Sequence, residues 1–174
     1  MRYLMMSLLA VVVFSAPALA QQPGAFGPRQ GDWEMTVAGF GASDRNIDNG
    51  NIAVTGEVGH YLTRELLVGA RQDLSWVGGS DTSDSYAGAT RAVAQWHFDF
   101  GEWRPFVGAN LGYVYGRDRA DSGTVGPEGG VKWYLQETTF VFARAGFDVE
   151  FRSSSDIDRR RGSWTYALGL GFNF

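Results

Sequence analysis

The chain has 174 residues, 24 glycines, an aromatic content of 14% and no cysteine. These values fit one domain and argue against a disulfide scaffold or a zinc site, and no cofactor is expected. The formal net charge is −4, so a nucleic-acid partner has no electrostatic support.

The first twenty residues have the pattern of a secretory signal peptide. Arg2 precedes an uncharged apolar run over residues 4–14, and residues 18–20 (Ala-Leu-Ala) form the small-x-small pattern of a cleavage site. The run is shorter than the roughly 20 residues that a transmembrane helix needs. We therefore expect export with cleavage after Ala20, followed by a flexible periplasmic lead over residues 21–31, which are rich in Gly, Pro and Gln.

From residue 32 onward, apolar side chains occupy every second position over segments of roughly 9 to 12 residues. Such alternation is typical of β-strands with two different faces. Eight segments follow one another, at residues 32–41, 51–62, 66–77, 86–98, 103–116, 124–135, 140–152 and 163–174. The two prolines inside them, Pro105 and Pro127, cannot donate to a strand ladder, so we expect one near a strand start and the other near an irregularity.

The two faces of these segments differ in chemistry. The apolar face, which includes Trp33, Val54, Leu74 and Leu170, carries no Asp, Glu, Lys or Arg. The other face carries the charges: Glu34, Glu57, Arg71, Asp73, Arg91, Arg104, Glu128, Lys132, Arg144, Asp148 and Glu150. A charge that faces lipid costs about 2–4 kcal/mol at the midplane, whereas charges inside a barrel can pair. The pattern predicts an all-β, eight-stranded antiparallel transmembrane up-and-down β-barrel over residues 32–174; a soluble lipocalin-like barrel would have the reverse arrangement.

Short and long connections alternate along the chain. The short ones, at 63–65, 99–102 and 136–138, are expected in the periplasm, because outer-membrane barrels place their longer loops outside. The longer polar ones lie near residues 42–50, 78–85, 117–123 and 153–162. Both chain ends would then be periplasmic. Within the first long connection, Asn49-Gly50 predicts a hairpin turn.

Three stretches resemble the small outer-membrane β-barrel family to which the transmembrane domain of OmpA-type proteins belongs. They are GHYLTRELLVGAR (59–71), WHFDFGEWRPFVGANLGYVYG (96–116) and GVKWYLQETTFVFARAGFDVEF (130–151). The resemblance implies an outer-membrane location, in contact with membrane lipids and lipopolysaccharide. The ending YALGLGFNF resembles the signal that the barrel-assembly machinery recognises, with Phe174 as its last residue. Because the sequence stops at the last strand, we expect the peptidoglycan-binding domain of full-length OmpA-type proteins to be absent.

The inward charges are the candidate functional residues. All of those given above except Arg104 form our candidate ion-pair network. Two functions stay open: a plugged barrel with a structural or surface-interaction role, or a narrow passive channel for small solutes or ions, in which Glu128 and Lys132 switch partners. Loops of this kind in resembling proteins serve adhesion, recognition or phage attachment, but the sequence does not identify the extracellular ligand.

An enzyme is the third alternative, because some resembling barrels of this size modify lipid A with a Ser, a His and a carboxylate. The two histidines, His60 and His97, precede short turns, on the side of the membrane away from lipid A. We therefore do not expect an enzyme.

Two loop motifs are weaker candidates. Residues 44–50 resemble the start of a calcium loop, but the glycine falls one place late and Thr55 stands where the loop needs Glu. Arg159, Arg160 and Arg161 offer guanidinium groups to lipopolysaccharide phosphates. The alternative for these arginines is a solvated loop, beside Asp156 and Asp158.

Overall fold

The computed structural model describes residues 26–43, 49–79, 82–117, 121–151 and 162–174. These residues form eight strands: β1 (Trp33–Ser43), β2 (Asn49–Tyr61), β3 (Leu66–Gly79), β4 (Thr82–His97), β5 (Trp103–Gly116), β6 (Ser122–Tyr134), β7 (Thr139–Phe151) and β8 (Gly162–Asn173). Each strand pairs antiparallel with its neighbours in sequence, and β1 pairs with β8 to close the barrel. This confirms the predicted fold class. In the described ranges, no helix has the length and hydropathy to cross a membrane.

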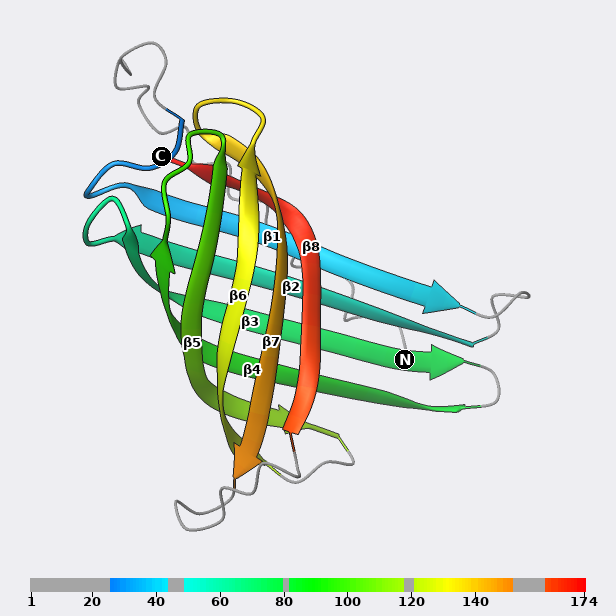
Figure 1. Cartoon of the computed structure of the whole chain (residues 1–174). Helices are drawn as coiled ribbons and strands as arrows, with labels where there is room; N and C mark the ends of the chain where they lie inside the picture. The colour runs from blue at the N-terminus through cyan, green and yellow to red at the C-terminus, as the bar shows by residue number, and fades with distance from the viewer. Residues whose placement is uncertain (1–25, 44–48, 80–81, 118–120, 152–161) are drawn as a thin grey trace.

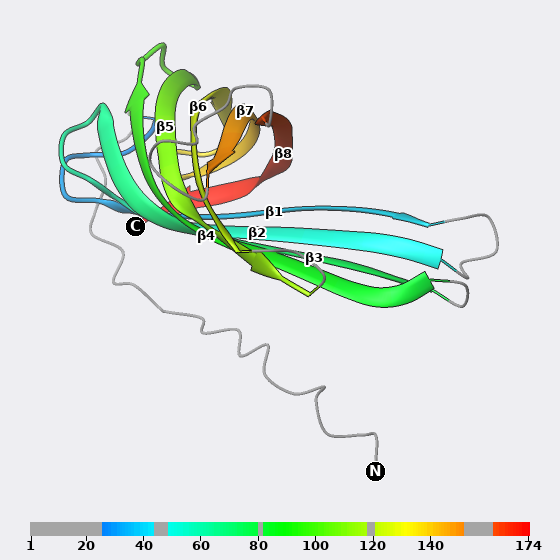
Figure 2. The same ribbon diagram turned by 90° about the horizontal axis from the view of Figure 1, so that it is seen from below.

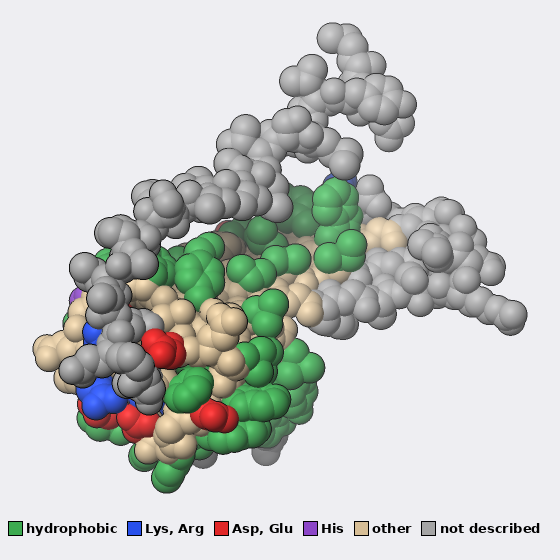
Figure 3. Space-filling view, turned by 90° about the horizontal axis from the view of Figure 1, so that it is seen from above, with side chains coloured by type: hydrophobic (Ala, Val, Ile, Leu, Met, Phe, Trp, Pro, Cys, Tyr) green, Lys and Arg blue, Asp and Glu red, His purple; other side chains and the backbone are tan. Residues whose placement is uncertain are grey.

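The alternation in the sequence becomes an apolar outer wall and a polar lumen. On the outer wall Val37, Leu111 and Leu170 are 51%, 57% and 60% exposed. On the inner wall Glu34 and Arg71 are 1% and 4% exposed. Figure 3 shows hydrophobic side chains over the outer wall, with charged side chains gathered at one end. Successive residues of a strand point to opposite faces, so the period of two in the sequence sets this separation.

The strands run further toward the long connections than the sequence predicts. β3 continues to Gly79 and β4 begins at Thr82, so the predicted loop over 78–85 is mostly strand. The predicted Asn49-Gly50 turn is also wrong, because both residues begin β2 and Gly50 pairs with Ser43 and Gly78. Ladder hydrogen bonds to two neighbours outweigh the turn preference of Asn, Gly and Ser.

The two prolines lie where a missing N–H is tolerated. Pro105 is the third residue of β5. Pro127 lies inside β6, at a gap in the ladder with β7 between the pairs Val125↔Val149 and Glu128↔Gly146. Both positions agree with the sequence-based expectation, because proline cannot donate to a ladder.

The junction of β1 and β8 is shorter than the others. It has five residue pairs, from Glu34↔Asn173 to Ala38↔Gly169, whereas β1 and β2 are paired at eleven positions. Beyond Ala38 and Gly169 the two strands diverge: in Figure 1, β1 runs across the view while β8 curves down it, and Figure 2 shows the same separation from below. The barrel is thus closed all round near the short turns and open on one side toward the loops. We call this opening the β1/β8 seam.

Candidate functional site in the barrel lumen

Residues 26–31 cover the end of the lumen near the short turns. The N–H of Gly27 donates to the carbonyl of Glu137 at 3.0 Å, and the N–H of Gly31 donates to the carbonyl of Tyr61 at 2.9 Å. The sequence predicts a flexible lead over residues 21–31, and for the described residues this expectation needs correction. Their backbone groups find partners on the barrel wall, which fixes the segment across the opening.

Arg104 holds this segment from inside the barrel. Its Nη2 donates to the carbonyl of Phe26 at 3.0 Å and to Asp99 Oδ2 at 2.7 Å. Gly27 has a φ of +91°, and a Cβ at this position would lie 2.3 Å from Arg104 Nε. Only glycine therefore fits where the chain crosses the guanidinium. We call residues 26–31 together with Arg104 the floor of the lumen.

Above the floor, Lys132 lies in an aromatic layer. Its Nζ is 2.5 Å and 2.7 Å from the two carboxylate oxygens of Glu34, and Tyr61 Oη donates to Glu34 at 2.7 Å. The Nζ also lies 5.8, 5.6 and 5.1 Å from the ring centres of Tyr61, Phe106 and Phe140. Cation–π contacts of this kind stabilise a charge that has left water. The layer thus fills the lumen around one paired lysine.

Arg71 is the centre of the next layer, which we call the middle layer. Its Nη1 and Nη2 donate to the two oxygens of Glu128 at 2.7 Å and 2.8 Å, and its Nε donates to Glu57 at 2.7 Å. Gln95 bridges the same two carboxylates at 3.1 Å and 2.8 Å. Arg144 Nη1 donates to Glu57 at 2.9 Å. A bidentate guanidinium pair is the strongest arrangement that these groups can form, so the layer is tightly held.

A third cluster, nearer the loops, is centred on Arg91. This arginine pairs with Asp73, and its Nη2 lies 3.3 Å from Asp148 Oδ2. Thr55 donates to Asp73 at 2.6 Å, and Asn110 donates to Asp148 at 2.9 Å. Every charged partner in this cluster thus comes from a different strand, which ties opposite walls together.

The ten candidate residues are therefore divided among separate contacts. Nine of them lie in the three clusters described above, and Glu150 accepts a hydrogen bond from Ser122 at 3.2 Å. Glu128 and Lys132, whose exchange of partners is part of the channel alternative, belong to different layers. Arg159, Arg160, Arg161 and residues 44–48 of the calcium-loop motif lie outside the described residues.

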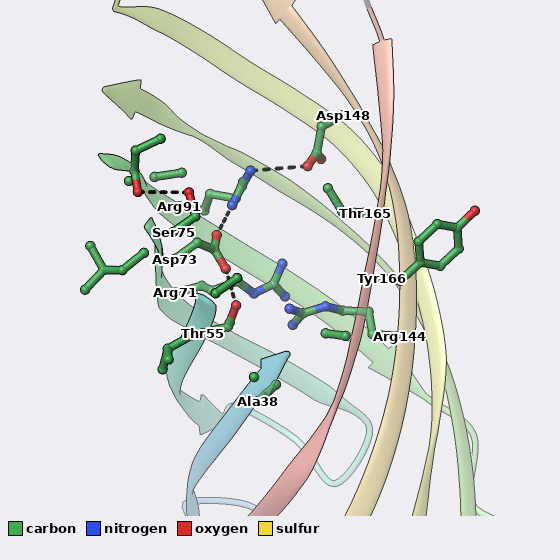
Figure 4. A pocket seen from close by; sticks show the side chains of 18 of the residues that line it. Ala38, Thr55, Arg71, Asp73, Ser75, Arg91, Arg144, Asp148, Thr165 and Tyr166 are labelled. Carbon is green, nitrogen blue, oxygen red and sulfur yellow. Dashed lines mark hydrogen bonds and ion pairs between the residues drawn. The ribbon is translucent and has the colours of Figure 1, made fainter. Parts of the chain in front are cut away.

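A cavity of about 650 Å³ occupies the lumen on the loop side of these clusters. Arg71, Arg91 and Arg144 reach into it, as Figure 4 shows, and the side chains of Asp73 and Asp148 lie beside them. Its wall also includes residues 38–39 of β1 and 164–168 of β8, so the cavity extends to the β1/β8 seam. The lumen is therefore filled toward the short turns and hollow toward the loops.

The two histidines lie at the end of the barrel near the short turns, where His60 and His97 stand at the ends of β2 and β4. His60 packs on the outer wall against Trp33, with ring centres 4.9 Å apart. His97 is 1% exposed in the aromatic layer, between the rings of Tyr61 and Phe106. In the part of the chain that the structure describes, no three His, Asp or Glu side chains gather as a metal site requires.

Comparison with known proteins agrees with this architecture. The profile of the OprF membrane domain family matches residues 4–174. The chain belongs to this family. It is an outer-membrane protein, and the family is one of outer-membrane barrels and porins. Outer membrane porin F of Pseudomonas aeruginosa is 28% identical over 184 residues, which cover 95% of this chain and 51% of that protein. The chain thus spans about half the length of this curated relative.

Solved structures share the fold at low sequence identity. Neisserial surface protein A has a TM-score of 0.58 at 14% identity, covering 82% of this chain and 96% of that one. OprG of P. aeruginosa has a TM-score of 0.56 at 13% identity, covering 85% and 98%. The N-terminal barrel domain of P. aeruginosa OprF has a TM-score of 0.50 at 19% identity, covering 84% and 98%. The resemblance to small outer-membrane barrels is confirmed.

Some residues of the lumen were not among the candidates. Tyr61 bridges Glu34 and Lys132, and Phe26 receives the hydrogen bond of Arg104. The parity of β2 places Tyr61 on the inward face with Glu57, so this residue was detectable. Phe26 was not, because nothing in a Gly/Pro/Gln-rich lead indicates that it turns back into the barrel.

Proposed function

We propose that this protein is a closed outer-membrane barrel with a structural or surface-interaction role, whose lumen does not conduct solutes. The observation that carries the proposal is the middle layer, where Arg71, Glu57 and Glu128 are 4%, 4% and 6% exposed and fully engaged with one another. The aromatic layer and the floor of the lumen lie below it. A solute would have to pass three consecutive barriers.

Opening the middle layer requires separating a buried ion pair. Removing one partner of such a pair costs about 3–5 kcal/mol, because the other charge stays buried without compensation. No alternative acceptor for Arg71 lies closer among the described residues than Glu57 and Glu128, both at 2.7 Å. Spontaneous opening by exchange of partners is therefore costly, which supports a plug over a gate.

Single-channel recording of the refolded mature protein in planar bilayers tests this proposal, with Glu128→Ala recorded alongside. We expect no discrete openings from either protein, because the aromatic layer around Lys132 stays in place when Glu128 is removed. Discrete openings of the unaltered protein would contradict a closed lumen.

A narrow channel is the second candidate function. The observation that favours it is the name of the 28% identical relative, a porin, although this chain spans about half of that protein. The same recording separates the two functions: openings whose size or frequency changes in Glu128→Ala would support a channel controlled by the middle layer.

We further infer that the protein is exported by residues 1–20 and inserted with the help of its C-terminal strand. Phe174 lies on the outer wall, 47% exposed, and exchanges two backbone hydrogen bonds of 2.9 Å with Trp33.

For Arg159, Arg160 and Arg161 we propose contact with lipopolysaccharide phosphates, which guanidinium groups bind bidentately. Replacing all three with Gln would then weaken lipopolysaccharide binding, whereas Arg64→Gln, in a short turn, would leave it unchanged.

A further inference from the structure

Along the β1/β8 seam, the edges of β1 and β8 are not paired with each other. β8 is paired with β7 from Gly162 to Phe172, yet β1 meets β8 only up to Gly169. If the same register continued, Gly39 would come opposite Leu168, and Ser43 opposite Trp164. The seam can therefore close without a register slip, which would otherwise turn every side chain to the wrong face. An opening with these properties is an entrance from the side of the barrel.

The rim of this entrance is apolar. Trp164, Tyr166 and Leu168 are 65%, 75% and 71% exposed along the outer wall of β8. Figure 4 shows Tyr166 pointing away from the cavity and Thr165 on its other side, toward the cavity. Because the outer wall faces lipid, a molecule that enters here comes from the membrane and carries apolar surface.

Inside, the cavity offers cationic donors that the clusters do not use. Arg144 donates from Nη1 to Glu57, and its Nε and Nη2 donate to none of the described residues. The Nε of Arg91 is buried without a hydrogen-bond partner. The carboxylates of Asp73 and Asp148, which also line the cavity, are both paired with Arg91. An added anion would thus meet free N–H groups, and buried polar groups without partners favour a ligand that satisfies them.

We propose that the cavity binds a long-chain fatty acid, whose carboxylate pairs with Arg144 and whose acyl chain leaves through the β1/β8 seam. A volume of about 650 Å³ is in the range of cavities that enclose small ligands. The apolar rim and the cationic interior match the two ends of this ligand. This site goes beyond the proposed function, because the cavity can bind a ligand whether or not the lumen conducts.

The first test removes the carboxylate's partner. Binding of cis-parinaric acid is measured by energy transfer from tryptophan, with the protein in nanodiscs and empty nanodiscs as blank. Losing a charge-assisted hydrogen bond should weaken binding in Arg144→Gln by about tenfold or more. Arg117→Gln is the matched control, because Arg117 lies at the end of β5 outside the cavity wall and also removes one positive charge. Equal affinities of the unaltered protein and Arg144→Gln, or no saturable binding at all, would overturn the proposal.

The second test closes the entrance. The chain has no cysteine, so the double variant Ala42→Cys/Thr165→Cys carries the only two thiols, at positions that face each other when the register continues. Oxidation should form the disulfide and abolish saturable binding, and reduction should restore it in the same sample. Unchanged binding after oxidation would exclude entry through the seam, and failure of the disulfide to form would contradict a seam that closes. Neither result depends on conductance, so this proposal and the closed lumen can fail separately.

Discussion

Arg71 is paired with two carboxylates in the lumen rather than with one. Three of its nitrogens reach two carboxylates from other strands, and the side chains of Arg71, Glu57 and Glu128 are 4%, 3% and 1% exposed. Because these charges have left water, each depends on the others for compensation. The middle layer should therefore respond strongly to the loss of its one central cation.

Replacing Arg71 with Met should lower the free energy of unfolding by about 3–5 kcal/mol, because Glu57 and Glu128 stay buried without their main partner. Urea unfolding in detergent micelles, followed by tryptophan fluorescence, measures the change. Arg64→Met is the control, since the Arg64–Asp99 pair at 3.3 Å has side chains that are 55% and 38% exposed and contributes about 0–1 kcal/mol. Similar losses in both variants would show that burial does not govern the middle layer.

At the scale of elements, the floor of the lumen depends on a glycine. Gly27→Val places a side chain on the guanidinium of Arg104 and in a left-handed conformation that valine disfavours. We expect the segment to leave the barrel and trypsin to cut after Arg29 faster, as mass spectrometry of the released N-terminal peptide would show. Gln136→Val, at an exposed position in a short turn away from the scissile bond, should leave the cleavage rate unchanged. Equal cleavage rates in Gly27→Val and the unaltered protein would contradict the claim that Gly27 holds residues 26–31 across the lumen.

The sequence predicts a strand well where the alternation of apolar and polar side chains defines it. It predicts a strand less well where backbone pairing with neighbouring strands defines it. The strands around Leu111 and Leu170 follow from alternation, because lipid excludes charge from one face. The sequence predicts a loop over residues 78–85 and a turn at Asn49-Gly50. Yet Asn49, Gly50 and residues 78–79 pair in the ladder between β2 and β3, and Thr82 and Ser85 pair with β3, which side-chain type does not reveal. The floor was missed for the same reason, since its contacts to Glu137 and Tyr61 are made by the backbone.

For the whole molecule, the outer wall should behave as a surface for lipid. Leu111, near the middle of β5, is 57% exposed there, and an arginine at this position would cost about 2–4 kcal/mol. Folding equilibria in lipid vesicles should therefore show a large loss for Leu111→Arg. Phe100→Arg, in a short turn at a position 70% exposed, should lose about 1 kcal/mol or less. The reverse order of losses would place the membrane elsewhere on the barrel.

The sequence predicts which charged residues line the lumen, but it does not predict which of them form ion pairs with one another. Parity alone places Glu34, Glu128 and Lys132 in the lumen. Which of them meet depends on strand register and on the tilt of the strands, and these join Lys132 to Glu34 across 98 positions of sequence. The β1/β8 seam was likewise out of reach, because both of its strands have ordinary alternation.

Surface labelling in intact cells tests most directly whether this barrel presents its long connections to the outside. Ser155→Cys lies between β7 and β8, and Gln136→Cys lies in the short turn between β6 and β7; each adds the only cysteine to the chain. With a polyethylene glycol maleimide too large to cross the outer membrane, we expect Ser155→Cys to be labelled in intact cells and Gln136→Cys only after that membrane is permeabilised. Labelling of Gln136→Cys in intact cells, with Ser155→Cys protected, would contradict the orientation on which the surface-interaction role depends.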